Sequence, residues 1–134
     1  MTKTRERILY LVCGVVIAAA SFALFYRTAI TATGDLIFHA RTANTLGLLR
    51  SMPLSEYIET VEFSHILGYP AWHFVCKVIT EILGLFLPTG TEEGLNLVLS
   101  VAASATNTFF LLITFGLYIV IFRHFFRGKN RGWL

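Results

Sequence analysis

Two long uncharged stretches constrain the fold of this chain more than any other feature. Residues 8–26 and 95–122 contain no Asp, Glu, Lys or Arg. A helix over 8–26 would be roughly 28 Å long, about the thickness of the hydrocarbon core of a bilayer. The composition agrees, because 55% of the residues are hydrophobic and only 14% are charged, whereas soluble proteins average about 25% charged residues. We therefore predict an all-α membrane protein with two transmembrane helices.

The first stretch also shares features with a secretory signal peptide. It follows a basic N-terminus, and the sequence Ala-Ala-Ala-Ser at 18–21 resembles a cleavage region. Apolar residues resume at Phe22, however, so the small residues lie inside the hydrophobic stretch rather than after it. The hydrophobic part of a signal peptide is shorter than this. An uncleaved transmembrane helix is the favoured interpretation.

Basic residues at both ends of the chain indicate how the two spans are oriented. Lys3, Arg5 and Arg7 precede the first span, and residues 123–134 contain several Arg and Lys but no acid. Basic flanks are retained in the cytoplasm, so both termini should be cytoplasmic, and we expect a bacterial inner membrane. Nucleic-acid binding by a basic tail is far less common beside a span, and we expect none. Residues 1–134 should form one membrane module, with span 8–26, outer segment 27–94, span 95–122 and basic tail 123–134.

The second stretch is longer than a bilayer requires, since about 20 residues are enough to cross. Either the helix tilts, or its first turns stand above the membrane. Small or weakly polar side chains recur along one side of it, which usually marks a seam between packed helices. A polar pathway is the less common alternative. These side chains belong to Asn96, Ser100, Ser104, Asn107 and Thr108.

The outer segment contains patterns that predict interfacial amphipathic helices. Residues 70–87 have Pro in the first turn and a wide apolar face beside a narrow polar strip. Such a helix lies in the membrane interface or packs beneath a neighbour. The alternative is a third span over 66–87, which would bury charges in lipid at roughly 2.5–3.5 kcal/mol each. A second helix is predicted near 35–50, where polar residues on several faces suggest a wet cleft or a protein cover. The polar strip of 70–87 consists of His73, Lys77, Thr80, Glu81 and Gly84.

Two acid–histidine pairs in the outer segment are candidates for chemistry. Asp35 and His39 are four residues apart, so a helix places them on one face. A carboxylate beside an imidazole can act as a general base or bind a divalent metal ion. Glu62 and His65 form a second pair, three residues apart. On spacing alone, a helix-capping Asp35 and solvated side chains at the other positions are the commoner alternative.

Three basic residues of the outer segment are candidates for binding an anion. Arg41, Arg50 and Lys77 would lie beside the membrane interface, where a cationic side chain can bind a substrate phosphate. Contacts with lipid headgroups are the alternative.

The order of these elements resembles the N-terminal part of the GT-C-type membrane glycosyltransferases. These polytopic enzymes use polyprenyl-phosphate sugar donors and include mannosyltransferase-like and aminoarabinosyltransferase-like members. The matching segments are "TGDLIFHARTANTL" at 33–46 and "HILGYPAWHFVCKVITEILG" at 65–84. The resemblance implies that Asp35 is a catalytic base or metal partner, with His39, Glu62 and His65 secondary and Arg41 or Arg50 facing the donor phosphate.

The chain departs from that family in two respects. Asp35 is followed by Leu36, where the family usually has a second acid, and two spans stand where the family has many more. We therefore expect either further spans of a longer enzyme or a shortened relative that works with a protein partner, because the isolated chain should not be a competent enzyme. The alternative is a non-catalytic small integral membrane protein, or accessory subunit, that docks a membrane partner. A channel or transporter fragment would need a charged residue in a span, and neither span has one.

Overall fold

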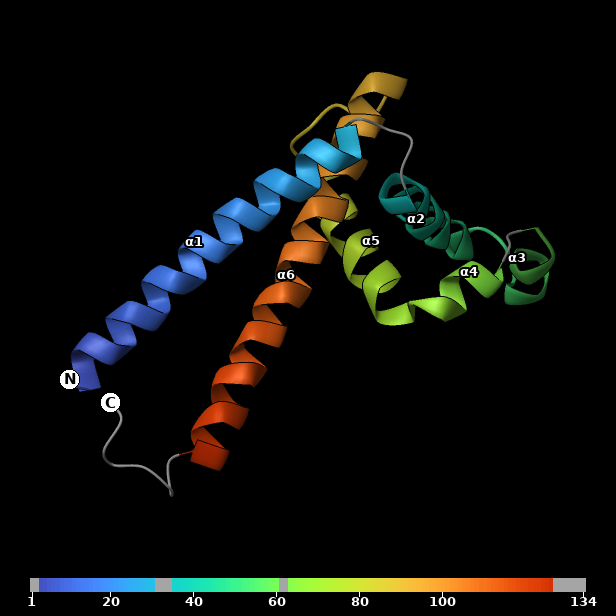
Figure 1. The fold of residues 1–134 in the computed structure, drawn as a ribbon. Helices are drawn as coiled ribbons and strands as arrows, with labels where there is room; N and C mark the ends of the chain where they lie inside the picture. The colour runs from blue at the N-terminus through green and yellow to red at the C-terminus, as the bar shows by residue number, and fades with distance from the viewer. Residues whose placement is uncertain (1–2, 31–34, 61–62, 127–134) are drawn as a thin grey trace.

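A computed structural model describes residues 3–30, 35–60 and 63–126, and these ranges contain helices but no strand (Figure 1). This confirms the predicted all-α class. The elements, in chain order, are α1 (Lys3–Ile30), α2 (Asp35–Thr45), the 3₁₀-helix η1 (Leu46–Arg50), α3 (Leu54–Thr60), α4 (Phe63–Gly68), α5 (Pro70–Gly84) and α6 (Glu92–Phe126).

The two longest helices, α1 and α6, pack against each other in opposite directions (Figure 1). Both are long and apolar enough to cross a membrane, over Thr4–Ala29 and Glu92–Phe125. The guanidinium of Arg123 donates to the carboxylate of Glu6 and lies 5.2 Å from the centre of the Tyr10 ring. This pair joins the first turns of α1 to the last turns of α6, so the start of one helix and the end of the other lie at the same end of the hairpin.

Both helices extend beyond the uncharged stretches that predicted them. The predicted spans were 8–26 and 95–122, whereas α1 has 28 residues and α6 has 35. At the start of α6, Thr91 Oγ1 accepts a hydrogen bond from the Gly94 amide at 3.1 Å. The Pro88 carbonyl passes so close that a Cβ on Gly94 would lie 2.1 Å from its oxygen. The turn after residue 87 therefore caps the helix three residues before the uncharged stretch begins.

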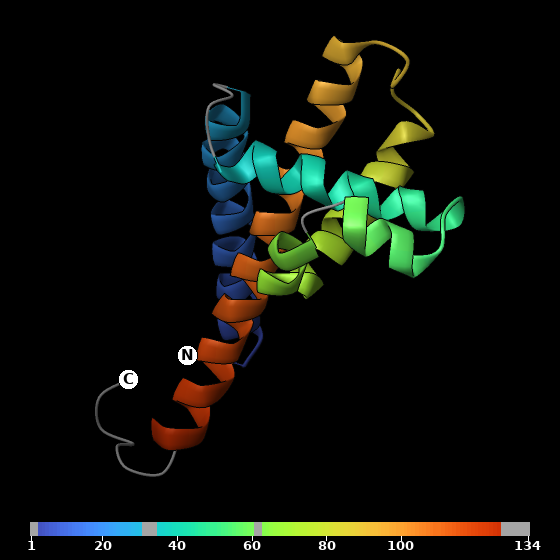
Figure 2. The ribbon, with the colours of Figure 1, turned by 90° about the vertical axis from the view of Figure 1, so that its right-hand side faces the viewer.

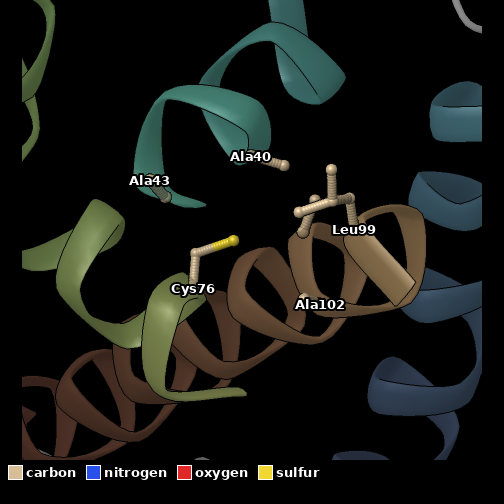
Figure 3. Close-up of a cluster of buried hydrophobic side chains, with 6 residues drawn as sticks. Ala40, Ala43, Cys76, Leu99 and Ala102 are labelled. Atoms are coloured by element: carbon tan, nitrogen blue, oxygen red, sulfur yellow. The ribbon is translucent and has the colours of Figure 1, made fainter. Parts of the chain in front are cut away.

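The outer segment forms a compact group of helices on one side of α6 (Figures 1 and 2). Helices α2 and α5 pack on each other and on the N-terminal half of α6 through small side chains (Figure 3). Small residues let helix backbones approach closely, as at helix interfaces within membranes. The shared buried cluster consists of Ala40, Ala43, Cys76, Leu99, Ala102 and Ala103.

The polar side of α6 is the seam that its spacing predicted. Ser100, Ser104 and Thr108 are buried, and Asn96 and Asn107 accept hydrogen bonds from side chains of the outer segment. The hydroxyl of Ser104 donates to the carbonyl of Ser100, one turn earlier. The C-terminal half of α6 differs, because it exposes large apolar side chains that include Leu117, Tyr118, Val120 and Phe122.

Two predicted outer helices have different bounds in the structure. The helix expected near 35–50 is α-helical only to Thr45 and continues as the tighter η1. The helix expected over 70–87 ends at Gly84, after which Leu85, Phe86 and Leu87 turn back toward α6. A single continuous helix over 66–87 does not form, because Tyr69 leaves the helical conformation at φ −142° and ψ 58° before Pro70.

Helix α5 buries part of its polar strip and exposes part of its apolar face. His73 and Thr80 are buried together with Cys76, whereas Phe74, Val78 and Ile82 are exposed by 66%, 42% and 52%. In a soluble amphipathic helix the polar side faces the solvent instead. The strip could not be oriented from spacing, since spacing shows which residues share a face but not which face meets the protein.

A charged cluster joins the C-terminal half of α5 to α2 and η1. Lys77 donates from Nζ to Asn44 Oδ1 at 2.9 Å and lies 2.6 Å from Glu81 Oε1. Arg50 approaches the other oxygen of Glu81 at 3.5 Å. Gly47 leaves space for the ammonium group, because a Cβ there would lie 2.9 Å from Nζ. Lysine and glutamate at these positions therefore satisfy each other within the fold.

Candidate functional site

A pocket of about 610 Å³ lies where four parts of the fold meet. Its α1 residues are mostly apolar, whereas the other helices and Tyr69 contribute a carboxylate, an imidazole, a phenol ring and an amide together with the apolar Leu36 and Trp72. Apolar and polar side chains therefore line a single cavity. The lining residues are Leu24, Phe25 and Thr28 of α1, Asp35, Leu36 and His39 of α2, Tyr69, Trp72 of α5 and Asn107 of α6.

Asp35 and His39 both line the pocket, and they lie side by side on α2 as their spacing predicted. Asp35 is the first residue of α2, and its side chain is 89% exposed. Its Oδ1 lies 3.3 Å from Nε2 of His39, one helical turn later. A carboxylate at a helix N-terminus also interacts favourably with the helix dipole. Asp35 therefore presents an accessible carboxylate at the pocket, with an imidazole beside it.

A buried histidine contacts the other ring nitrogen of His39. Nε2 of His73, on α5, lies 3.0 Å from Nδ1 of His39. His73 is fully buried, and this burial lowers the pKa of its imidazole, to which the neighbouring His39 adds a smaller effect in the same direction. The carbonyls of Ile66 and Tyr69 act in the opposite direction. The buried ring is therefore held toward its neutral form.

Aromatic rings and one amide complete the pocket around His39. The rings of Tyr69 and Trp72 meet the His39 ring edge to face, at centroid distances of 5.4 and 6.1 Å. The indole Nε1 of Trp72 donates to Asn107 Oδ1 at 2.7 Å, which fixes the ring against α6. His39 is thus held on several sides, while Asp35 in front of it stays exposed.

The remaining predicted site residues do not line this pocket. His65 packs edge to face on Phe38 at 5.1 Å, on the side of α2 that faces α4. Arg41 donates to Asn96 Oδ1 at 2.9 Å, and Arg50 belongs to the charged cluster of Glu81. Glu62 lies outside the described residues.

A divalent metal ion was among the expectations for this site. Within 3–30, 35–60 and 63–126, no group of three or more His, Cys, Asp or Glu side chains is placed to hold one.

Sequence reasoning missed four residues of the site: Tyr69, Trp72, His73 and Asn107. Tyr69 to His73 belong to the segment that carried the family resemblance, and His73 lay in the polar strip of the predicted helix. A polar residue on the strip of an otherwise apolar helix is the signal that points to His73. Asn107 was assigned to the seam, which is where it lies, but its partner Trp72 is 35 residues away in the chain.

No protein-family model, curated protein or solved structure matches this chain. The function is therefore argued from the pocket and from the residues that line it.

Proposed function

We propose that this chain is the N-terminal module of a membrane glycosyltransferase that takes a sugar from a polyprenyl-phosphate donor. The observation that carries the proposal is a mostly apolar pocket that Asp35 and His39 line together with Leu24 and Phe25. A lipid-linked sugar has the same mixed chemistry, with an isoprenoid chain that suits the apolar side chains and a polar head that suits the carboxylate and the imidazole. The resemblance of 33–46 and 65–84 to such enzymes supports the same assignment.

The position of the pocket along the hairpin supports a site at the membrane surface. Leu24 and Phe25 stand at the end of the uncharged stretch of α1, level with Asn107 on α6. From Asn107 to Phe125, α6 rises roughly 27 Å, which is about one hydrocarbon thickness. In this proposal the bilayer extends from the Glu6–Arg123 end to the pocket, and the N-terminal turns of α6 stand above it with the outer segment.

The start of α5 also agrees with this placement. Phe74 is exposed two residues after Trp72 of the pocket and would meet the membrane surface, while His73 beside it is buried. The basic tails at the opposite end would then be cytoplasmic, as the positive-inside rule predicts.

In the proposed reaction Asp35 is the general base. Its carboxylate accepts the proton of the acceptor hydroxyl while that oxygen forms a bond to the anomeric carbon of the sugar. The bond from this carbon to the phosphate oxygen breaks, and polyprenyl phosphate leaves with the bonding electron pair. Arg41 and Arg50 stay predicted contacts of the donor phosphate, although each binds another side chain in this structure. Further spans, from a longer chain or a partner, would enclose the substrate.

The test compares two carboxylate-to-amide changes in the full assembly. Asp35→Asn removes the base without changing its size, and we expect sugar transfer to fall about 100-fold or more, since general bases contribute about 10²–10⁴-fold. Glu59→Gln, at an exposed acid of α3 that does not line the pocket, is the matched control and should transfer normally. Normal transfer by the Asp35→Asn variant would refute the proposal.

A second candidate function is that of a non-catalytic membrane subunit. The observation in its favour is the extent of exposed apolar surface on the C-terminal half of α6, where Leu117 and Phe122 are both more than half exposed. Co-purification from membranes separates the two functions. A stable partner together with activity that is insensitive to Asp35 would favour the accessory role.

A further inference from the structure

Three side chains form a line from the pocket into the interior of the outer segment. Asp35 Oδ1 lies 3.3 Å from His39 Nε2, and His39 Nδ1 lies 3.0 Å from His73 Nε2. The line begins at a side chain that is 89% exposed and ends at a residue that is fully buried. Both ring nitrogens of His39 therefore face a polar atom, whereas His73 contributes only one nitrogen to the line.

The hydrogens of the two rings can be assigned from these contacts. A neutral imidazole carries one N–H and one bare nitrogen, and an ionised carboxylate can only accept. Because Nε2 of His39 faces Asp35, that nitrogen should carry the hydrogen, which leaves Nδ1 of His39 as an acceptor. The atom available to donate to it is Nε2 of His73, so His73 should carry its hydrogen there.

The fourth ring nitrogen is Nδ1 of His73, which is buried and has no hydrogen-bond partner among the described residues. The assignment leaves this nitrogen bare, as an acceptor without a donor, and a buried N–H without an acceptor would be the rarer case. Burial lowers the pKa of the His73 ring and so disfavours its charged form, although the carbonyls of Ile66 and Tyr69 act in the opposite direction.

We propose that His73 is a positioning residue, which fixes His39 in the Nε2–H tautomer and thereby orients the imidazole N–H toward the Asp35 carboxylate at the pocket. This inference rests on the proposed role of Asp35 as the base. The tautomer of a histidine is set by what its other nitrogen contacts. With both of its nitrogens engaged, His39 has no free lone pair, so the accepting atom of the site is an oxygen of Asp35.

Other groups around the two rings fix their planes. Tyr69 and Trp72 contact His39 edge to face, and Trp72 also contacts His73 at a centroid distance of 5.5 Å. His65, on α4, acts electrostatically on His73 and disfavours its protonation. The geometry around His39 therefore depends on α2, α4 and α5 together.

The experiment measures the tautomer of His39 directly. The full chain is labelled with ¹⁵N-histidine, placed in lipid nanodiscs near pH 8, and its ring nitrogen shifts are recorded. The chain has four histidines, and the signals of His39 are identified by their loss in His39→Gln. Two variants of the buried residue are compared: His73→Gln keeps an N–H donor near the Nε2 position, and His73→Leu removes it.

We expect His39 to be a single Nε2–H tautomer in the wild type and in His73→Gln, and a mixture in His73→Leu. The same Nε2–H tautomer in His73→Leu would overturn the proposal, as would an Nδ1–H tautomer or a mixture in the wild type. If His73→Leu does not fold, the wild-type and His73→Gln spectra decide between these outcomes.

Transfer assays on the full assembly distinguish this inference from the proposed function. We expect kcat to fall at least about 10-fold in His73→Leu with little change in KM, since correct orientation of a base is part of its 10²–10⁴-fold contribution, and His73→Gln should recover most of the loss. Wild-type kcat in His73→Leu, alongside an inactive Asp35→Asn, would refute the positioning role but not the base. Unchanged transfer in Asp35→Asn would instead refute the proposed function, while the tautomer result would stand.

Discussion

The charged cluster on α5 should stabilise the packing of the outer segment. Lys77 has a side chain that is only 15% exposed, and its ammonium group has two partners, Glu81 at 2.6 Å and Asn44 at 2.9 Å. Replacing Glu81 by Leu removes the countercharge and leaves a mostly buried cation with one neutral acceptor. The perturbation therefore tests whether the inward polar strip of α5 depends on this pair.

The magnitude follows from the exposure of the two side chains. Removing one partner of a fully buried ion pair costs about 3–5 kcal/mol, whereas an exposed pair contributes about 0–1 kcal/mol. Glu81 is 42% exposed, so water screens part of the interaction, and Asn44 still accepts from Lys77. We expect Glu81→Leu to destabilise the protein by about 1–2 kcal/mol, which corresponds to a fall in Tm of roughly 4–8 °C for a chain of this size.

The assay is equilibrium unfolding in detergent, followed by far-ultraviolet circular dichroism. Lys77→Met should cost less than Glu81→Leu, because the remaining Glu81 is partly exposed and Arg50 lies 3.5 Å from it. The double variant should recover at least half of the loss caused by Glu81→Leu, since the buried charge is then gone. Glu59→Leu is the control for loss of an exposed acid. Additive losses, or no loss in Glu81→Leu, would show that the pair does not stabilise this interface.

Three further predictions concern pH, thiol reactivity and topology. Lys77, and less strongly Arg50, lower the pKa of Glu81 below its ordinary value of 4.5. The Lys77–Glu81 pair should therefore stabilise the fold above pH 4.5 and lose this effect as the pH falls through the lowered pKa. An identical loss of stability on acidification in the Glu81→Gln variant would contradict this. Burial raises the pKa of the Cys76 thiol to about 11. In a Cys13→Ser protein at pH 8, a maleimide should therefore react with Cys76 only after unfolding. Rapid labelling of the folded protein would contradict the burial of Cys76. A single cysteine at the exposed Ser51 should react with a membrane-impermeant maleimide from the outer side of intact cells, and reaction only after lysis would overturn the proposed orientation.

The long helices could be predicted because their evidence is local in the chain. Charge-free stretches fix where a membrane helix can lie, and 8–26 and 95–122 are both contained within the observed helices α1 and α6. The ends were missed because they depend on particular contacts, such as the close approach of Pro88 to Gly94. Spacing of four residues likewise sufficed to bring Asp35 and His39 together.

The rest of the site could not be predicted because it depends on contacts between distant segments. His39 and His73 are 34 residues apart, and Trp72 and Asn107 are 35 apart. Helical periodicity placed His73 on a polar strip, but the packing of small residues such as Ala43 and Cys76 determines that this strip faces α2. The inward orientation of α5 is therefore a property of the assembled helices and not of the helix alone.

The most direct test of the account is to find where a polyprenyl phosphate binds. A polyprenyl phosphate with a photoreactive group in its first isoprene units is irradiated with the protein in nanodiscs, and the labelled peptide is identified by mass spectrometry. The account predicts labelling of α1 near Leu24 and Phe25, which unlabelled polyprenyl phosphate competes away and which Phe25→Trp reduces by filling the pocket. Labelling spread over the exposed half of α6, or labelling that no competitor removes, would contradict the claim that this pocket is the donor site.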